Sequence, residues 1–99
     1  MELVNKHLLT VVAEAALERR LLEELGGVGI TGYTVTIAHG AGVRGGREGD
    51  IEGGNVRIEC VTSRDKAEAA LAVLARDYFA HYACVAWLVP VEVVRAGHF

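Results

Sequence analysis

Apolar and polar positions alternate along two stretches of the chain, residues 33–39 and 55–62. Such alternation predicts β-strands with one covered face, because successive side chains of a strand point to opposite sides of its sheet. Residues 7–13 and 83–89 are apolar at most positions, which predicts strands that are covered on both faces. The chain is therefore expected to contain four strands, two of them with apolar side chains on either side.

Two further stretches, residues 14–25 and 64–80, carry apolar side chains at helical spacing. In the first, leucines recur every four residues and fall on one stripe, at Leu17, Leu21 and Leu25. In the second, the corresponding stripe consists of Ala67, Ala70, Leu71, Leu74 and Tyr78. Both stretches are predicted to be helices that bury one face.

Local signals set the expected ends of these elements. Gly26-Gly27 is predicted to stop the first helix, because glycine accepts the left-handed conformation that follows a helix. Thr62 is predicted to cap the second helix, with Asp65 three residues further on as in a capping box. Pro90 either ends the fourth strand or marks it as an edge strand, and residues 91–94 are a candidate short strand beyond it.

The resulting order is strand, helix, strand, loop, strand, helix, strand, which is the ferredoxin-like pattern. It predicts an α+β sandwich in which both helices cover one face of a four-stranded antiparallel sheet. A length of 99 residues allows a single domain, residues 1–99. Because the first and fourth strands are apolar on both sides, and 52% of all residues are hydrophobic, the other sheet face is expected to pack against copies of itself.

Composition excludes several classes of protein. A formal net charge of −3 and the lack of a basic tail argue against a nucleic-acid-binding or membrane-surface protein. No apolar run approaches the roughly 20 residues that a membrane span needs. The start of the chain lacks an export signal, and the only two cysteines are not closely spaced, so we expect a cytoplasmic protein with reduced thiols.

Glycine dominates the long connection at residues 40–54, where it fills seven of fifteen positions. The stretch from Gly40 to Gly45 satisfies the G-x-G-x-x-G pattern, but the residues that follow would not start the helix that a dinucleotide site requires. Backbone N–H groups at glycine can still approach an anion closely, and Arg44 and Arg47 add positive charge. The sequence leaves two interpretations open, a phosphate-binding loop or a solvated mobile loop.

Evidence for catalysis or a metal is weaker. His81 and Cys84 have an H-x-x-C spacing, but nothing repeats this pair and a zinc site needs three or four ligands, so we expect no metal. No serine or cysteine lies in a recognisable nucleophile context, and no Walker lysine follows the glycine-rich loop. The chain is therefore not expected to be an enzyme.

Four segments together resemble the PII signalling superfamily: residues 29–35 before the long loop, Gly40-Ala41-Gly42 at its base, Val56-Arg57-Ile58-Glu59 and Pro90-Val91-Glu92. The resemblance extends over about residues 4–97. It implies a homotrimer of ferredoxin-like subunits that binds adenine nucleotides in the clefts between subunits. It also implies that the mobile loop, the T-loop at about residues 41–54, docks on partner proteins.

The chain departs from classical nitrogen-regulatory members of that superfamily. Its loop has no tyrosine for modification, and Tyr82-Ala83-Cys84-Val85 stands where they carry Gly-x-Gly-Lys. Residues 79–83, Phe-Ala-His-Tyr-Ala, and residues 42–47, Gly-Val-Arg-Gly-Gly-Arg, are instead similar to PII-like proteins of inorganic-carbon uptake. These are the bicarbonate-transporter-associated and carboxysome-associated types.

That resemblance implies a sensor whose ligand is ADP, AMP, cyclic AMP or ATP, with bicarbonate as a further ligand, and which acts on a bicarbonate transporter or a carboxysome-related protein. Thr34 and the backbone at Glu59 and Val61 would contact adenine or ribose. The implied nucleotide-binding residues are Thr34, Gly40, Ala41, Gly42, Val43, Arg44, Arg47, Glu59, Val61, Ala83, Cys84 and Val85. The alternatives are a classical nitrogen-regulatory sensor, a ferredoxin-like metal- or amino-acid-binding module, and a weak nucleotide hydrolase.

Overall fold

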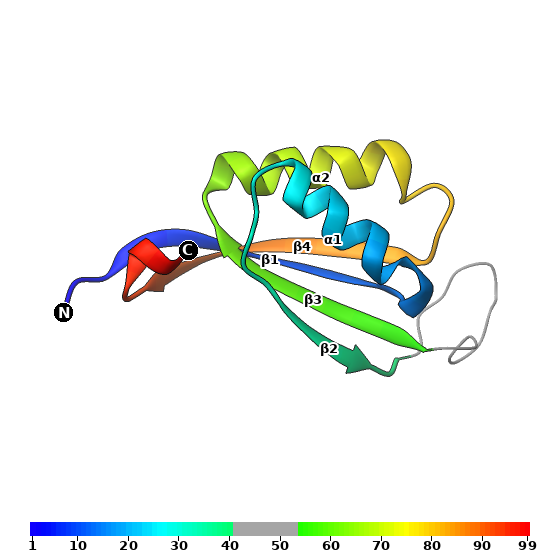
Figure 1. Cartoon of the computed structure of the whole chain (residues 1–99), viewed down its shortest axis with the longest axis horizontal. Helices are drawn as coiled ribbons and strands as arrows, with labels where there is room; N and C mark the ends of the chain where they lie inside the picture. The colour runs from blue at the N-terminus through cyan, green and yellow to red at the C-terminus, as the bar shows by residue number, and fades with distance from the viewer. Residues whose placement is uncertain (41–53) are drawn as a thin grey trace.

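A computed structural model describes residues 1–40 and 54–99 of the chain. Four antiparallel strands form one sheet in the order β2-β3-β1-β4, and the two α-helices lie together on one side of it (Figure 1). In chain order the elements are β1 (Val4–Glu14), η1 (Ala15–Leu17), α1 (Glu18–Gly27), β2 (Thr34–Ala38), β3 (Asn55–Thr62), α2 (Arg64–Asp77), β4 (Cys84–Val93) and η2 (Ala96–His98). The predicted ferredoxin-like α+β sandwich is confirmed.

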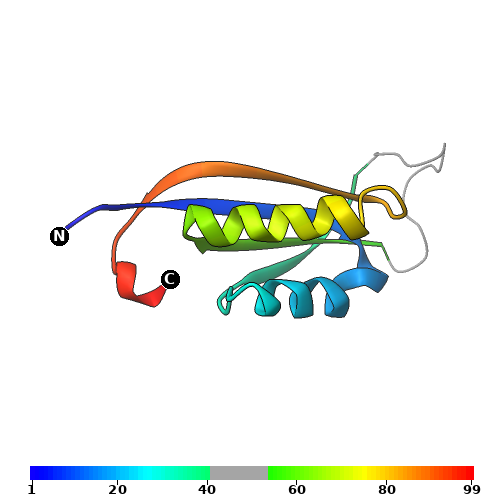
Figure 2. The same cartoon turned by 90° about the horizontal axis from the view of Figure 1, so that it is seen from above.

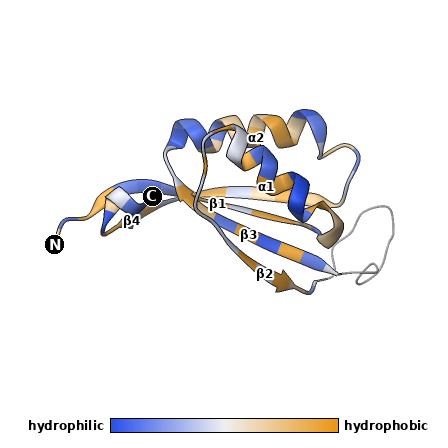
Figure 3. Cartoon of the chain, in the orientation of Figure 1, coloured by the Kyte–Doolittle hydropathy of each residue, from blue (hydrophilic) through white to orange (hydrophobic). Residues whose placement is uncertain are grey.

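The core lies between the sheet and the two helices. Val56, Ile58 and Cys60 of β3 face it and are nearly inaccessible, as the alternation of that strand predicts. Apolar side chains on β1, α1 and α2 complete the core, among them Leu9, Val11, Leu21, Leu25, Leu74 and Tyr78. Figure 3 shows hydrophobic residues, in orange, on the strands of the sheet and on both helices. Burial of these side chains is the main force that holds the helices on the sheet.

The first helix, α1, begins four residues later than predicted. Residue 14 was expected to be helical, but Glu14 is the last residue of β1: it pairs with Asn55, and its N–H donates to the carbonyl of Ala83. A 3-10 turn follows, and α1 starts only at Glu18. Backbone pairing on both sides of the strand end therefore outweighs the helical leucine pattern.

Glycine ends α1, although not the glycines that were expected. Gly26 and Gly27 remain inside the helix, whereas Gly29 takes the left-handed conformation with φ 91°. The N–H of Ile30 donates to the carbonyl of Leu25, and the N–H of Gly29 donates to that of Gly26, which together make a Schellman motif. Ile30 and Leu25 are both buried in the hydrophobic core.

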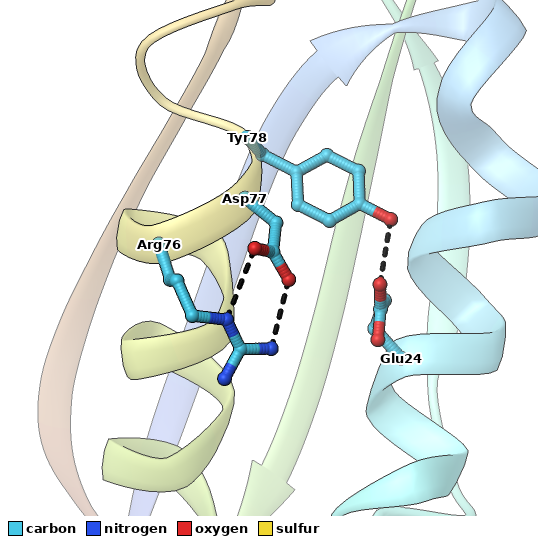
Figure 4. Close-up of polar contacts among 4 residues, drawn as sticks. All are labelled: Glu24, Arg76, Asp77 and Tyr78. Carbon is cyan, nitrogen blue, oxygen red and sulfur yellow. Dashed lines mark hydrogen bonds and ion pairs between the residues drawn. The ribbon is translucent and has the colours of Figure 1, made fainter.

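The second helix is capped by Ser63, not by Thr62. The Ser63 hydroxyl accepts from the N–H of Lys66 at 3.3 Å, while Thr62 is the last residue of β3, paired with His7 and buried. The helix ends at Asp77, three residues before the predicted end. Tyr78 follows it, and its hydroxyl donates to Glu24 of α1 at 2.8 Å (Figure 4).

The last strand continues through its proline. Pro90 lies opposite His7, and residues 91–93 of the predicted extension belong to the same strand, β4, which ends at Val93. Within residues 1–40 and 54–99 this strand pairs with β1 alone, so a residue without an N–H is tolerated on its other side. The edge-strand interpretation of Pro90 is thus confirmed.

The other edge strand, β2, is less covered than predicted. Of its apolar side chains Val35 packs against the core, but Ile37 is 82% exposed. The expectation of a half-buried strand with Ile37 on the covered face is therefore wrong for this single chain. Among the described residues β2 pairs with β3 alone and is an edge strand of the sheet.

Candidate functional site

The sheet face that points away from the helices is strongly apolar near β1 and β4. Leu8 and Val12 of β1 pair with Val89 and Val85 of β4, and Thr10 lies opposite Trp87. Val85, Trp87 and Val89 are 57%, 42% and 42% exposed, a large apolar area for so small a domain. We call these residues (Leu8, Thr10, Val12, Val85, Trp87 and Val89) the open face.

Polar groups border the open face on the β3 side. The guanidinium of Arg57 lies 5.8 Å from the centre of the Trp87 ring and 3.4 Å from a carboxylate oxygen of Glu59. The hydroxyl of Thr10, between Trp87 and Glu59 in register, is fully buried and has no hydrogen-bond partner among the described residues. Arg57 and Glu59 of β3 therefore form a charged border along one side of the apolar open face.

A pocket of about 460 Å³ opens at one end of the sheet. It is formed by the turn between α1 and β2, the second half of β3, the first turn of α2 and the last residues of the chain. Its lining consists of Leu8, Gly29, Ile30, Thr31, Gly32, Tyr33, Thr34, Glu59, Cys60, Val61, Thr62, Lys66, His98 and Phe99. The volume lies within the range of small-molecule sites.

Local structure explains how the pocket forms. The Schellman motif reverses the chain at Gly29 and buries Ile30, so residues 31–33 run along the pocket before β2 begins. Thr34 then pairs with Glu59 of β3. Because Ser63 caps α2 directly after β3, the first turn of that helix and Lys66 lie beside the same turn.

The C-terminal residues reach the pocket through a sharp bend. Arg95 has a left-handed backbone with φ 59°, after which η2 returns toward the turn between α1 and β2. Both views place the chain end beside that turn (Figures 1 and 2). Arg95 and His98 also contact each other, with 2.8 Å between a guanidinium nitrogen and Nε2. His98 and Phe99 therefore close one side of the pocket.

Three predicted site residues, Thr34, Glu59 and Val61, line this pocket together. Three others, Ala83, Cys84 and Val85, lie at the opposite end of the sheet. In register, Cys84 is beside Ala13 of β1, whereas Val61 is beside Leu8, five residues away along the same strand. Five residues of strand span about 17 Å. A single chain therefore presents two separated groups of predicted site residues.

The second group is held firmly in place. Glu14 accepts a hydrogen bond from the N–H of Ala83 through Oε2 at 3.0 Å, and its own N–H donates to the Ala83 carbonyl. Cys84 is buried, and burial followed by the charge of Glu14 raises the pKa of its thiol to about 11. The Cys84 thiol is therefore neutral and can line a cleft but not carry charge there.

The remaining predicted site residues belong to the glycine-rich connection. Gly40 lies two residues after Ala38, the end of β2, and Ala41, Gly42, Val43, Arg44 and Arg47 lie outside the described part of the chain. Gly40 does not line the pocket; it lies beyond Ala38, which pairs with Asn55 at the start of β3. Gly40 thus belongs to the same end of the sheet as Ala83.

Sequence reasoning missed part of the pocket. Thr31, Gly32 and Tyr33 were recognised as a motif but were not assigned to the site. Lys66, His98 and Phe99 also line the pocket, but no sequence motif marks them. A lysine on a helix and the last residues of a chain are usually solvated, so nothing in the sequence assigned them to a site. Their role depends on contacts between segments that are more than 30 residues apart.

Two further expectations concern metals and membranes. Within residues 1–40 and 54–99, no three His, Cys, Asp or Glu side chains gather where they could hold a metal ion. In the same residues, neither helix is long and apolar enough to cross a membrane.

The fold and the pocket define a ferredoxin-like domain with a ligand-sized pocket at one end of its sheet. The chain belongs to the family described as nitrogen regulatory protein P-II, whose sequence model matches residues 6–98. No sequence among curated proteins matches this chain. The resemblance to the PII superfamily is thereby confirmed, and the chain is a PII-like signalling protein.

Solved structures support the same assignment. A PII-like signaling protein from Thermus thermophilus is 45% identical, with 100% of this chain and 99% of that chain covered and a TM-score of 0.86. CPII from Thiomonas intermedia, a nitrogen regulatory PII-like protein bound to ADP, AMP and bicarbonate, is 19% identical over 95% of this chain and 98% of that chain, with a TM-score of 0.82.

The Bacillus subtilis GlnK–ATP complex is 21% identical over 88% of this chain and 82% of that chain, with a TM-score of 0.62. CPII and GlnK are both less than 25% identical to this chain, so these two structures show a shared fold and nothing more specific.

Proposed function

We propose that this protein senses adenine nucleotides (ADP, AMP or cyclic AMP) together with bicarbonate, and regulates inorganic-carbon uptake through its T-loop at about residues 41–54. The observation that carries the proposal is that Thr34, Glu59 and Val61 line one pocket of ligand size. CPII, with the same fold, is bound to ADP, AMP and bicarbonate.

The separated second group of residues supports assembly into a homotrimer. In a subunit cleft, Ala83 to Val85 of one chain would meet the pocket of the next chain, which joins the two groups that one chain keeps about 17 Å apart. The open face would supply the contact, because its exposed valines and Trp87 gain free energy when they are covered. Gly40 and the arginines of the connection would then approach the phosphates.

Binding is measured by calorimetry with ADP, AMP, cyclic AMP and ATP, each with and without bicarbonate. Thr34→Val removes one hydroxyl at nearly constant volume, and we expect it to weaken adenine ligands about tenfold. Thr36→Val is the matched control, since Thr36 lies two residues along the same strand and does not line the pocket. If none of the four nucleotides binds at millimolar concentration, the proposal is wrong.

Arg44 is proposed to neutralise phosphate. Arg44→Ala should weaken ADP far more than adenosine, because only ADP carries the charge that the guanidinium recognises. Equal weakening of both ligands would remove Arg44 from the proposed site and leave the pocket residues unaffected.

We further propose that the protein works as a cytoplasmic sensor and not as an enzyme. Both cysteines are free and buried, and burial raises the pKa of each thiol to about 11, so neither is suited to be a nucleophile. Steady release of phosphate from ATP by the purified protein would contradict this part of the proposal.

A further inference from the structure

One positive charge reaches the pocket from a helix. Lys66 lies in the first turn of α2 and lines the pocket beside the turn that contains Gly29. A side-chain carbon placed on Gly29 would come within 3.2 Å of Cε and 3.6 Å of Nζ of Lys66. The end of the lysine therefore lies where residue 29 has no side chain.

The Lys66 ammonium has no ion pair or hydrogen bond within residues 1–40 and 54–99, although several other basic side chains do. Arg64, two residues earlier, contacts Glu68 at 2.6 Å. Arg57 contacts Glu59, an acidic residue of the pocket lining, at 3.4 Å. Among the described residues, the Glu59 carboxylate is therefore already paired with Arg57 and does not neutralise the Lys66 ammonium.

We propose that Lys66 is the residue that selects for an oxyanion in the pocket, either a phosphate of the nucleotide or bicarbonate. This inference rests on the proposed function, because it assigns one ligand group to a residue of the same pocket. An ammonium at the end of a flexible stem acts as a point charge toward phosphate or carboxylate oxygens. Such charge-assisted hydrogen bonds are about twice as strong as neutral ones.

Gly29 takes part in this selection. Its left-handed φ ends α1, and the missing side chain leaves the space that the distal part of Lys66 occupies. One glycine thus both turns the chain toward β2 and admits the lysine to the pocket. A larger residue at position 29 would push the ammonium away from the turn.

The test compares Lys66→Met with wild type by calorimetry. Methionine keeps an apolar stem of similar length and removes the charge. Arg64→Met is the matched control, because it removes the same charge from the same helix turn outside the pocket. The ligands are ADP, AMP and adenosine, each measured with and without bicarbonate.

If Lys66 binds a phosphate of the nucleotide, Lys66→Met lowers the affinity for ADP about tenfold or more and leaves the affinity for adenosine unchanged. Lys66→Arg then restores part of the affinity for ADP. If it reads bicarbonate, ADP binding without bicarbonate is unchanged and the effect of added bicarbonate is lost. The inference is overturned if ADP and adenosine weaken equally, or if Lys66→Met behaves like Arg64→Met.

The two proposals can fail separately. Should wild-type protein bind no adenine nucleotide, the proposed function is lost, and Lys66 is then tested by NMR titration with pyrophosphate and with bicarbonate alone. Shifts at residues 29–34 in wild type that vanish in Lys66→Met would retain the oxyanion site. The absence of any response to both anions would end that inference as well.

Discussion

The hydroxyl of Tyr78 donates a 2.8 Å hydrogen bond to Oε2 of Glu24 and so joins the end of α2 to α1 (Figure 4). Tyr78 is almost fully buried, and the guanidinium of Arg20 lies 5.3 Å from the centre of its ring. Neighbouring Arg76 and Asp77 form an ion pair of their own at 2.8 Å (Figure 4). The Tyr78–Glu24 bond is thus a polar contact that fixes the two helices to one another.

Tyr78→Phe should therefore lower the free energy of unfolding by about 1 kcal/mol, since it leaves a partly buried carboxylate without its donor. Urea denaturation measures this change. Tyr33→Phe is the control, because Tyr33 is 49% exposed. This variant should change the free energy of unfolding by no more than about 0.5 kcal/mol. Equal losses in the two variants would contradict the role of the hydrogen bond.

The same hydrogen bond predicts that the stability of the fold depends on pH in the alkaline range. Burial, and then the hydrogen bond to Glu24, raise the pKa of Tyr78 above its ordinary value of 10.0. A pKa that is higher in the folded state gives stability that is complete below pH 10 and is lost as the pH rises through the folded value. Stability curves of wild type and Tyr78→Phe should accordingly converge above pH 10; parallel curves there would be inconsistent with a raised pKa.

Alanine substitutions at two glycines near the end of α1, Gly29 and Gly26, should change the stability of the fold in opposite directions. Gly29→Ala places a side chain at φ 91° and against Lys66, and should destabilise the fold by about 1 kcal/mol or more. Gly26→Ala should stabilise it by about 0.5–1 kcal/mol, because Gly26 is helical and has open space around it. Thermal unfolding of the two variants checks the pair, and changes of the same sign would refute the left-handed assignment.

The open face predicts how the protein assembles. Trp87→Glu places a charge among exposed valines and should shift the protein toward monomers in sedimentation velocity. Phe79→Glu is the matched control, because Phe79 has nearly the same exposure, 40% against 42%, but follows α2 on the helix side. If Trp87→Glu keeps the wild-type mass, the open face is not the contact between subunits.

Both thiols should react slowly in the folded protein. Burial raises the pKa of Cys60 to about 11, as it does for Cys84, so only roughly one thiol in a thousand is ionised at pH 8. In the unfolded chain the ordinary value of 9.0 ionises roughly one in ten. An aromatic disulfide reagent should thus react at least about a hundredfold more slowly with native than with urea-unfolded protein, and similar rates would show that the thiols are accessible.

Sequence patterns alone were sufficient for the type and order of the elements. The alternation of Val56, Ile58 and Cys60 with charged residues, and the leucine stripe of α1, encode which side of each element is covered. Such patterns are local because the repeat of a strand or a helix is local. The motif from Gly29 to Val35 was also recognisable in the sequence, whereas Pro90 was compatible with a strand end or an edge strand until the pairing of β4 was known.

Element ends required tertiary structure. Glu14 is drawn into β1 by Asn55 and Ala83, and Ser63 takes the cap that was assigned to Thr62 because Thr62 pairs with His7. In each case a residue compatible with two local structures is decided by a partner that is distant along the chain. The exposure of Ile37 likewise depends on the position of β2 at the edge of the sheet.

By itself, then, the sequence determined the ferredoxin-like order and the apolar sheet face, whereas Thr34, Glu59 and Val61 were site residues that a family resemblance implied. Only the tertiary structure decided that Lys66 and His98 share a pocket with them, and that Ala83 to Val85 lie at the other end of the sheet. The physical reason is that periodicity records which side of an element is buried. Distances between side chains depend instead on strand register and on where each turn directs the chain.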